Sequence, residues 1–203
     1  MITRRAPPTP ARWLAAWAVA YNVAHHLGLL PAAEAGGGTR WNDWLDLAVP
    51  YAVVGTALAA LAACRTDRRG WVAGLVGAGL YAQGHGLHLG ANSIANARGP
   101  AAPVHLWDEV VGHALWYAGV AVLIAVLVRA AADVAPTPVG WALAAATGVT
   151  WATNALGAEG LPPYGLAVAL GLAAYGGQRR TGAGRLLLAG SAVSAVVLGA
   201  VLV

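Results

Sequence analysis

Residues 104–128 read VHLWDEVVGHALWYAGVAVLIAVLV, a stretch that is apolar except for four ionisable residues near its beginning. A helix of this length would extend for about 38 Å at 1.5 Å per residue. The hydrocarbon core of a bilayer is about 30 Å thick. The stretch therefore predicts a membrane-spanning helix that carries polar groups at one end.

Six further apolar stretches flank this one, and a span needs roughly 17–25 residues. Loops rich in Gly, Pro or charge separate them. We therefore predict an all-α, polytopic membrane protein with seven transmembrane helices, formed by residues 1–203 as a single domain. The first stretch is predicted to be a retained helix and not a cleaved signal peptide, because it contains polar residues and no clean cleavage site. The remaining predicted spans are about 13–30, 46–64, 71–92, 139–157, 162–177 and 186–203.

The composition excludes several classes of protein. Hydrophobic residues make up 59% of the chain and charged residues 10%, whereas soluble domains have about 25% charged residues. The chain has no Lys, so it cannot form a retinal Schiff base. Its one cysteine, Cys64, excludes an internal disulfide and a Cys-rich metal site. The basic residues form no patch interleaved with aromatics, so we expect the lipid bilayer, and not nucleic acid, as the partner.

The arginines predict the orientation of the chain in the membrane. With a cytoplasmic N-terminus, ten of them fall on the cytoplasmic side, and only Arg40 and Arg98 fall outside. Cytoplasmic loops are enriched in basic residues. The bias favours a multi-pass protein of the cell's inner (plasma) membrane, with the C-terminus on the extracytoplasmic side.

Polar residues concentrate in three of the predicted spans, and all six histidines are among them. His85, His88 and Asn92 share one helical face at i, i+3 and i+7. His105, Glu109 and His113 form a similar stripe at i, i+4 and i+8, with Asp108 on its flank. Asn22, His25 and His26 share a face of the first span. All three groups fall towards the outer ends of their helices, so we expect one common polar layer in the outer leaflet.

Ionisable groups inside a membrane are energetically costly and usually functional. Several imidazoles and carboxylates in one layer of low polarity are typical of a metal site. Imidazole binds zinc, iron and copper. We expect a divalent cation, zinc first, with iron or copper as alternatives. A carboxylate beside the ion would serve as a general base, and Asn92 would orient the substrate. The predicted metal ligands are His25, His85, His88, Glu109 and His113. The predicted catalytic residues are Asp108, Glu109 and Asn92.

These residues favour a metal-dependent membrane enzyme that hydrolyses a lipid or another hydrophobic small molecule. A mononuclear iron or copper oxidoreductase is the first alternative, and a proton- or metal-ion-coupled transporter is the second. Haem-based electron transfer by two axial histidines and a non-catalytic assembly factor or receptor also stay open.

Overall fold

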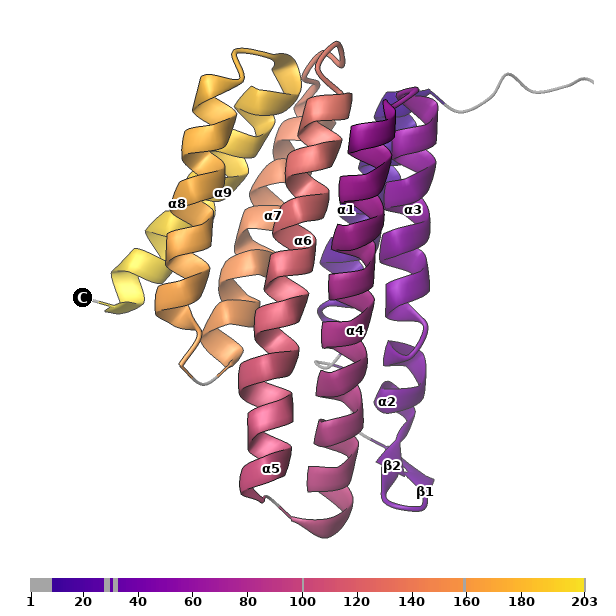
Figure 1. The fold of residues 1–203 in the computed structure, drawn as a ribbon. Helices are drawn as coiled ribbons and strands as arrows, with labels where there is room; N and C mark the ends of the chain where they lie inside the picture. The colour runs from indigo at the N-terminus through magenta and orange to yellow at the C-terminus, as the bar shows by residue number, and fades with distance from the viewer. Residues whose placement is uncertain (1–8, 28–29, 31–32, 100, 159, 203) are drawn as a thin grey trace, which may run out of the picture.

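A computed structural model describes residues 9–27, 30, 33–99, 101–158 and 160–202. Within these residues the chain forms a helical bundle with one short antiparallel hairpin (Figure 1). The elements in chain order are α1 (Pro10–Ala24), β1 (Glu34–Gly36), β2 (Thr39–Arg40), α2 (Trp41–Asp46), α3 (Val49–Ala63), α4 (Arg68–Arg98), α5 (Ala102–His105), the π-helical segment η2 (Leu106–Gly112), α6 (His113–Ala130), α7 (Pro138–Gly157), α8 (Pro162–Gln178) and α9 (Gly182–Leu202).

Each predicted apolar stretch coincides with a helix, which confirms the all-α prediction. Three helical runs are long and apolar enough to cross a membrane, namely Trp41–Ala63, Ala102–Ala130 and Gly182–Leu202, and they suggest a membrane protein. The α1 and α8 helices have 15 and 17 residues, shorter than a usual span of about 20. The count of seven spans therefore stays a prediction. Residues 28 and 29, at the end of the first predicted span, lie outside the described residues.

Local sequence signals set the helix boundaries. Prolines occupy the first turn of α1, α3, α5, α7 and α8, where the missing N–H costs no hydrogen bond. Asp67 caps α4 by accepting a hydrogen bond from the Gly70 amide at 2.7 Å, and Thr137 caps α7 through Gly140 at 3.0 Å. The α4 helix ends at Gly99, whose φ of 86° favours glycine.

The bundle is built from paired neighbouring helices. The α4 helix packs against α6, α9 against both α7 and α8, and α1 against α3. Figure 1 shows that α4 and α5 extend beyond the α7–α8 turn at one end of the bundle, where the β1–β2 hairpin also lies. The polar residues of α4 and η2 belong to this extended end.

Two pairs of glycines let α4 approach the continuous run of η2 and α6 closely. A Cβ atom added at Gly84 would lie 2.5 Å from the carbonyl oxygen of Gly112, and one at Gly119 would lie 2.7 Å from that of Gly77. Real side-chain atoms cannot occupy such positions, so only glycine permits this spacing. The seven-residue separation within each helix brings both pairs onto one interface. Small residues of this kind are the usual means of close helix association in membranes.

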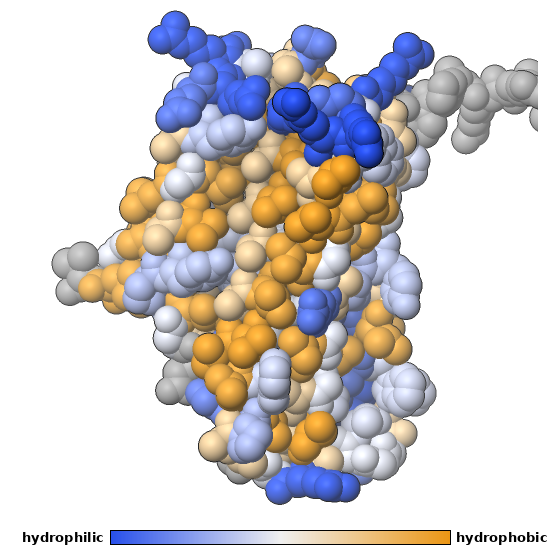
Figure 2. All heavy atoms as spheres, viewed as in Figure 1, coloured by the Kyte–Doolittle hydropathy of each residue, from blue (hydrophilic) through white to orange (hydrophobic). Residues whose placement is uncertain are grey.

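The surface of the bundle is apolar around its middle. Val19, Leu75, Leu170 and Val196 are among many large apolar residues that are more than 45% exposed. Figure 2 shows hydrophobic residues over most of the middle and hydrophilic residues gathered mainly at the two ends. Eight arginines belong to the end that holds the α3–α4 and α8–α9 turns, namely Arg12, Arg65, Arg68, Arg69, Arg129, Arg179, Arg180 and Arg185.

Candidate metal centre

A group of three potential metal ligands lies where α4 passes η2 and the beginning of α6. His88 comes from α4, Asp108 from η2, and His113 is the first residue of α6. Each offers one ligand atom, and these atoms all lie within 4.8 Å of one another. Asp108 and His113 are 8% and 6% exposed. The group could therefore hold a metal ion in the interior of the protein.

Hydrogen bonds inside the group set the orientation of both rings. His113 Nδ1 donates to the backbone carbonyl of Asp108 at 3.0 Å, which leaves Nε2 with a free lone pair. A backbone carbonyl on the second nitrogen is the usual support for a metal-binding histidine. His88 Nδ1 lies 2.5 Å from Asp108 Oδ1, and the His88 and His113 ring centroids are 4.6 Å apart.

The π-helical segment explains why Asp108, and not Glu109, joins this group. In a regular α-helix, residue i+4 lies nearly above residue i, and residue i+5 is turned about 140° away. A π-turn pairs residues i and i+5 instead. Within η2, Asp108 therefore takes the place one turn before His113. Glu109 Oε2 lies 3.6 Å from His113 Nδ1, on the side of the ring that already faces backbone.

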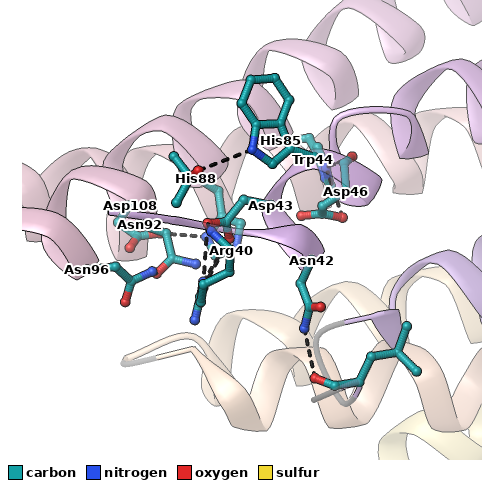
Figure 3. A network of polar contacts seen from close by, with 12 residues as sticks. Arg40, Asn42, Asp43, Trp44, Asp46, His85, His88, Asn92, Asn96 and Asp108 are labelled. Carbon is teal, nitrogen blue, oxygen red and sulfur yellow. Dashed lines mark hydrogen bonds and ion pairs between the residues drawn. The ribbon is translucent and has the colours of Figure 1, made fainter. Parts of the chain in front are cut away.

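His85 is held by a different carboxylate. Its Nε2 donates to the backbone carbonyl of Asp46 at 3.2 Å and lies 3.4 Å from Asp46 Oδ1. Figure 3 shows this contact between α4 and the end of α2. His85 is 2% exposed, and its Nδ1 is buried without a hydrogen-bond partner among the described residues. His85 thus presents an unused lone pair inside the protein.

His25 has partners for both ring nitrogens. Its Nδ1 donates to the carbonyl of Tyr21 at 2.6 Å, so its Nε2 is the acceptor for the Tyr81 hydroxyl at 3.2 Å. The ring also stacks on Trp116, with centroids 4.9 Å apart. Its contacts therefore connect α1 to α4 and α6.

Trp116 is the aromatic centre of the site, and the sequence reasoning missed it. Its ring lies 4.9 to 5.6 Å from four imidazoles, those of His25, His85, His88 and His113. The feature of the sequence that could have identified Trp116 is its position three residues after His113, on the same helical face. The indole is an apolar surface that contacts His25 and His85 on one hand and, on the other, two rings of the group formed by His88, Asp108 and His113, hereafter the metal group.

The segment before α3 covers this end of the bundle with its own polar contacts. Arg40 and Asp43 form an ion pair at 2.8 Å, and Asn42 donates to the Leu30 carbonyl at 2.8 Å. Trp44 donates to the Thr39 hydroxyl at 3.1 Å. Figure 3 shows these contacts beside His85, His88 and Asp108. The acidic residues Asp43 and Asp46 thus have separate partners, Arg40 and His85.

The remaining predicted site residue, Asn92, lies one turn beyond His88 on α4. Its side-chain oxygen accepts a hydrogen bond from Asn96 at 3.2 Å (Figure 3). The structure thus brings His88, His113 and Asp108 together, and it leaves His25, His85 and Asn92 with other partners. The predicted roles of these three stay predictions.

Comparison of the chain with known protein families, curated proteins and solved structures finds no match. The functional argument therefore depends on the chemistry of the site.

Proposed function

We propose that this chain is an integral membrane metalloenzyme that binds one divalent cation through His88, Asp108 and His113. We further propose that it hydrolyses a lipid or another hydrophobic substrate. The observation that carries this proposal is the convergence of three ligand atoms from α4, η2 and α6 within 4.8 Å.

The donor set suits a catalytic metal. Two imidazoles and one carboxylate are three protein ligands, which leaves a coordination position for water or substrate. Asp108 is nearly buried, and a buried carboxylate is costly unless a cation or hydrogen bonds compensate its charge. His88 Nδ1 contacts this carboxylate at 2.5 Å, and a divalent cation would compensate its negative charge more fully.

The distances require a small adjustment on binding. Ligand atoms about 2.1 Å from one ion lie about 3.4 Å apart in a tetrahedron and at most about 4.2 Å apart in any geometry. Ligand atoms as much as 4.8 Å apart must therefore move closer together. The 2.5 Å contact between His88 and Asp108 must open, because the ion replaces the shared proton.

A bound metal would supply a water of lowered pKa for attack on an ester or amide. The other residues would serve that reaction. Asp46 orients His85, and the unpartnered Nδ1 of His85 can accept a proton. Trp116 and the exposed apolar faces around the bundle favour a hydrophobic substrate that arrives from the bilayer.

An iron-dependent oxidoreductase is the second candidate, and one observation favours it. Two histidines and one carboxylate are also the ligands of mononuclear non-haem iron sites. The identity of the metal decides between the two reactions.

The packing at the other end of the bundle weighs against transport. Leu61 and Leu123 are fully buried, and Val120 and Leu127 are 1% and 2% exposed. A path for protons or ions needs polar groups throughout its length. Among the described residues, this end of the α3, α4 and α6 interface is filled by apolar side chains.

The membrane placement is part of the proposal. We propose that all seven long helical runs cross the bilayer and that the arginine-rich end faces the cytoplasm. The metal group then lies towards the extracytoplasmic side. The short α1 and α8 helices would be matched by local thinning of the bilayer or by tilt of the longer helices.

The test is metal content after purification in mild detergent and reconstitution with zinc or iron(II). Wild-type protein should retain one metal per chain. Asp108→Asn, which removes the charge but keeps the shape, should lose it. The neighbouring change Glu109→Gln is the matched control and should retain it, as should His26→Ala in the turn after α1.

Two results would overturn the proposal. One is a folded wild-type protein that retains neither metal after dialysis. The other is loss of metal in Glu109→Gln while Asp108→Asn stays loaded.

A further inference from the structure

A narrow apolar groove enters the bundle from the arginine-rich end. It runs between α1, α6, α7, α8 and α9 and has a cavity volume of about 200 Å³. Its lining extends from Thr137, the N-cap of α7, to Trp151 on that helix, and from Ala183 to Ser194 on α9. At 1.5 Å per residue, these limits correspond to a length of about 16–21 Å. A long and thin cavity of this kind fits an extended hydrocarbon chain.

The groove leads from the surface into the core. Val139 in its lining is 64% exposed, whereas Trp151 and Ala169 are 3% and 1% exposed. Two of its four hydroxyl groups are already used, because Thr147 donates to the Leu143 carbonyl and Ser194 to the Gly148 carbonyl. Most of the other lining residues are Ala, Leu, Val or Gly, so the part of an occupant inside the groove is expected to be apolar.

Positive charge flanks the open end of the groove. Arg12 follows the lining residue Ala11, and Arg185 lies between the lining residues Ala183 and Leu186. Both arginines are exposed. Arg129 is also close in sequence to the lining, but it is paired with Asp67. Arg12 and Arg185 are therefore the cations that could meet an anionic group at the open end.

We propose that this groove binds one acyl chain of an anionic phospholipid, with Arg12 and Arg185 binding the headgroup phosphate. Apolar burial would hold the chain, and juxtamembrane arginines attract anionic headgroups. The inference depends on the proposed membrane placement and is independent of the metal group, which lies towards the other end of the bundle.

The test is native mass spectrometry of the full chain released from nanodiscs that contain equal amounts of phosphatidylglycerol and phosphatidylcholine. Wild-type protein should retain one phosphatidylglycerol per chain after extended detergent washing. Ala15→Phe places a bulky ring in the groove and should reduce the retained lipid at least tenfold. Val19→Phe is the matched control, because Val19 lies one turn away on α1, is 47% exposed and does not line the groove.

The headgroup is tested with Arg12→Gln combined with Arg185→Gln. This double variant should retain both lipids equally, whereas Arg98→Gln at the opposite end should keep the preference for phosphatidylglycerol. The proposal is overturned if Ala15→Phe and Val19→Phe retain the same amount of lipid. It is also overturned if wild-type protein retains phosphatidylcholine or a free fatty acid equally well. Metal content measured on the same samples reports separately on the metal centre.

Discussion

The two ring nitrogens of His85 have different surroundings, and this distinguishes His85 from the residues of the metal group. One nitrogen contacts Asp46, and the other is buried without a partner among the described residues. His88 and His113, by contrast, converge on Asp108. A buried unpaired acceptor costs about 1–3 kcal/mol. This cost would be removed when a substrate or a water molecule donates a hydrogen bond to that nitrogen.

The role of His85 can be tested by comparison with His88. His85→Gln should keep the bound metal, because the three ligands are untouched, and should lower the free energy of unfolding by about 1–3 kcal/mol through the altered Asp46 contact. His88→Gln should lose the metal. Metal analysis and thermal unfolding measure the two effects. Loss of metal from both variants would make His85 a ligand, as the sequence pattern predicts.

At this scale the sequence predicts part of the site. Helical spacing on α4 and α6 selects His88 and His113 as candidate ligands, and the structure brings both beside Asp108. It favours Glu109 over Asp108 because the spacing assumes a regular α-helix, and η2 departs from one. The partners of His25 and His85 lie 56 and 39 residues away in the sequence. No local pattern could reveal them.

Among the elements, the α4–α6 pair determines whether the site can form. Gly84 and Gly112 put the two backbones in direct contact one residue away from His85 and His113. Gly84→Ala should destabilise the protein by about 1–3 kcal/mol through overpacking and should weaken metal binding. Gly86→Ala is the control, because a Cβ there meets nothing within 4 Å. Unfolding and metal titration measure both. Equal stability of the two variants would show that the close approach is not required.

The α3–α4 turn provides a prediction about pH, outside the spans. Hydrogen bonds from the Gly70 amide and the Arg129 side chain lower the pKa of Asp67 below its ordinary value of 3.8. A carboxylate whose pKa is lower in the folded state stabilises the protein above its unfolded-state pKa, and this contribution disappears as the pH falls through the folded-state value.

Asp67→Asn should therefore unfold at a lower temperature than wild type at pH 7. The difference should shrink steadily as the pH is lowered below about 4. Thermal unfolding over this pH range is the measurement, with Asp133→Asn as a surface control. A difference that is independent of pH would exclude the charged form of Asp67 as its cause.

The elements themselves were largely predictable, because apolar runs bounded by Pro, Gly and Arg coincide with the helices. The α4 helix exceeds its predicted span at both ends, from 71–92 to Arg68–Arg98, because polar residues can continue a helix that projects beyond an apolar layer. The β1–β2 hairpin was not predicted. Its signal was Gly36-Gly37-Gly38, all with positive φ, which permits a tight reversal.

For the whole molecule, the uneven distribution of arginine predicts the orientation in the membrane. Cys64 is the one cysteine of the chain and lies in the α3–α4 turn at the arginine-rich end. A membrane-impermeant maleimide should therefore label inside-out vesicles and leave intact cells unlabelled. Cys64→Ser is the control for background labelling. Labelling of intact cells would reverse the proposed orientation.

The sequence predicts the class of this fold better than its placement in a bilayer. Composition alone indicates lipid as the surroundings, because 10% charged residues cannot cover a soluble surface. Which helices cross depends on tilt and on local bilayer thickness, because α1 is shorter than a usual span and α4 has many polar residues. The candidate site is in turn a property of the assembled bundle, since its three proposed ligands come from two packed helical runs.

X-ray absorption at the edge of the bound metal tests the central proposal most directly. In reconstituted wild-type protein, the spectrum should show nitrogen and oxygen neighbours at about 2.0–2.2 Å, with the multiple scattering of two imidazoles. His113→Ala should remove that signature. An ion surrounded by oxygen alone, or by imidazoles that persist in His113→Ala, would contradict a metal centre formed by His88, Asp108 and His113.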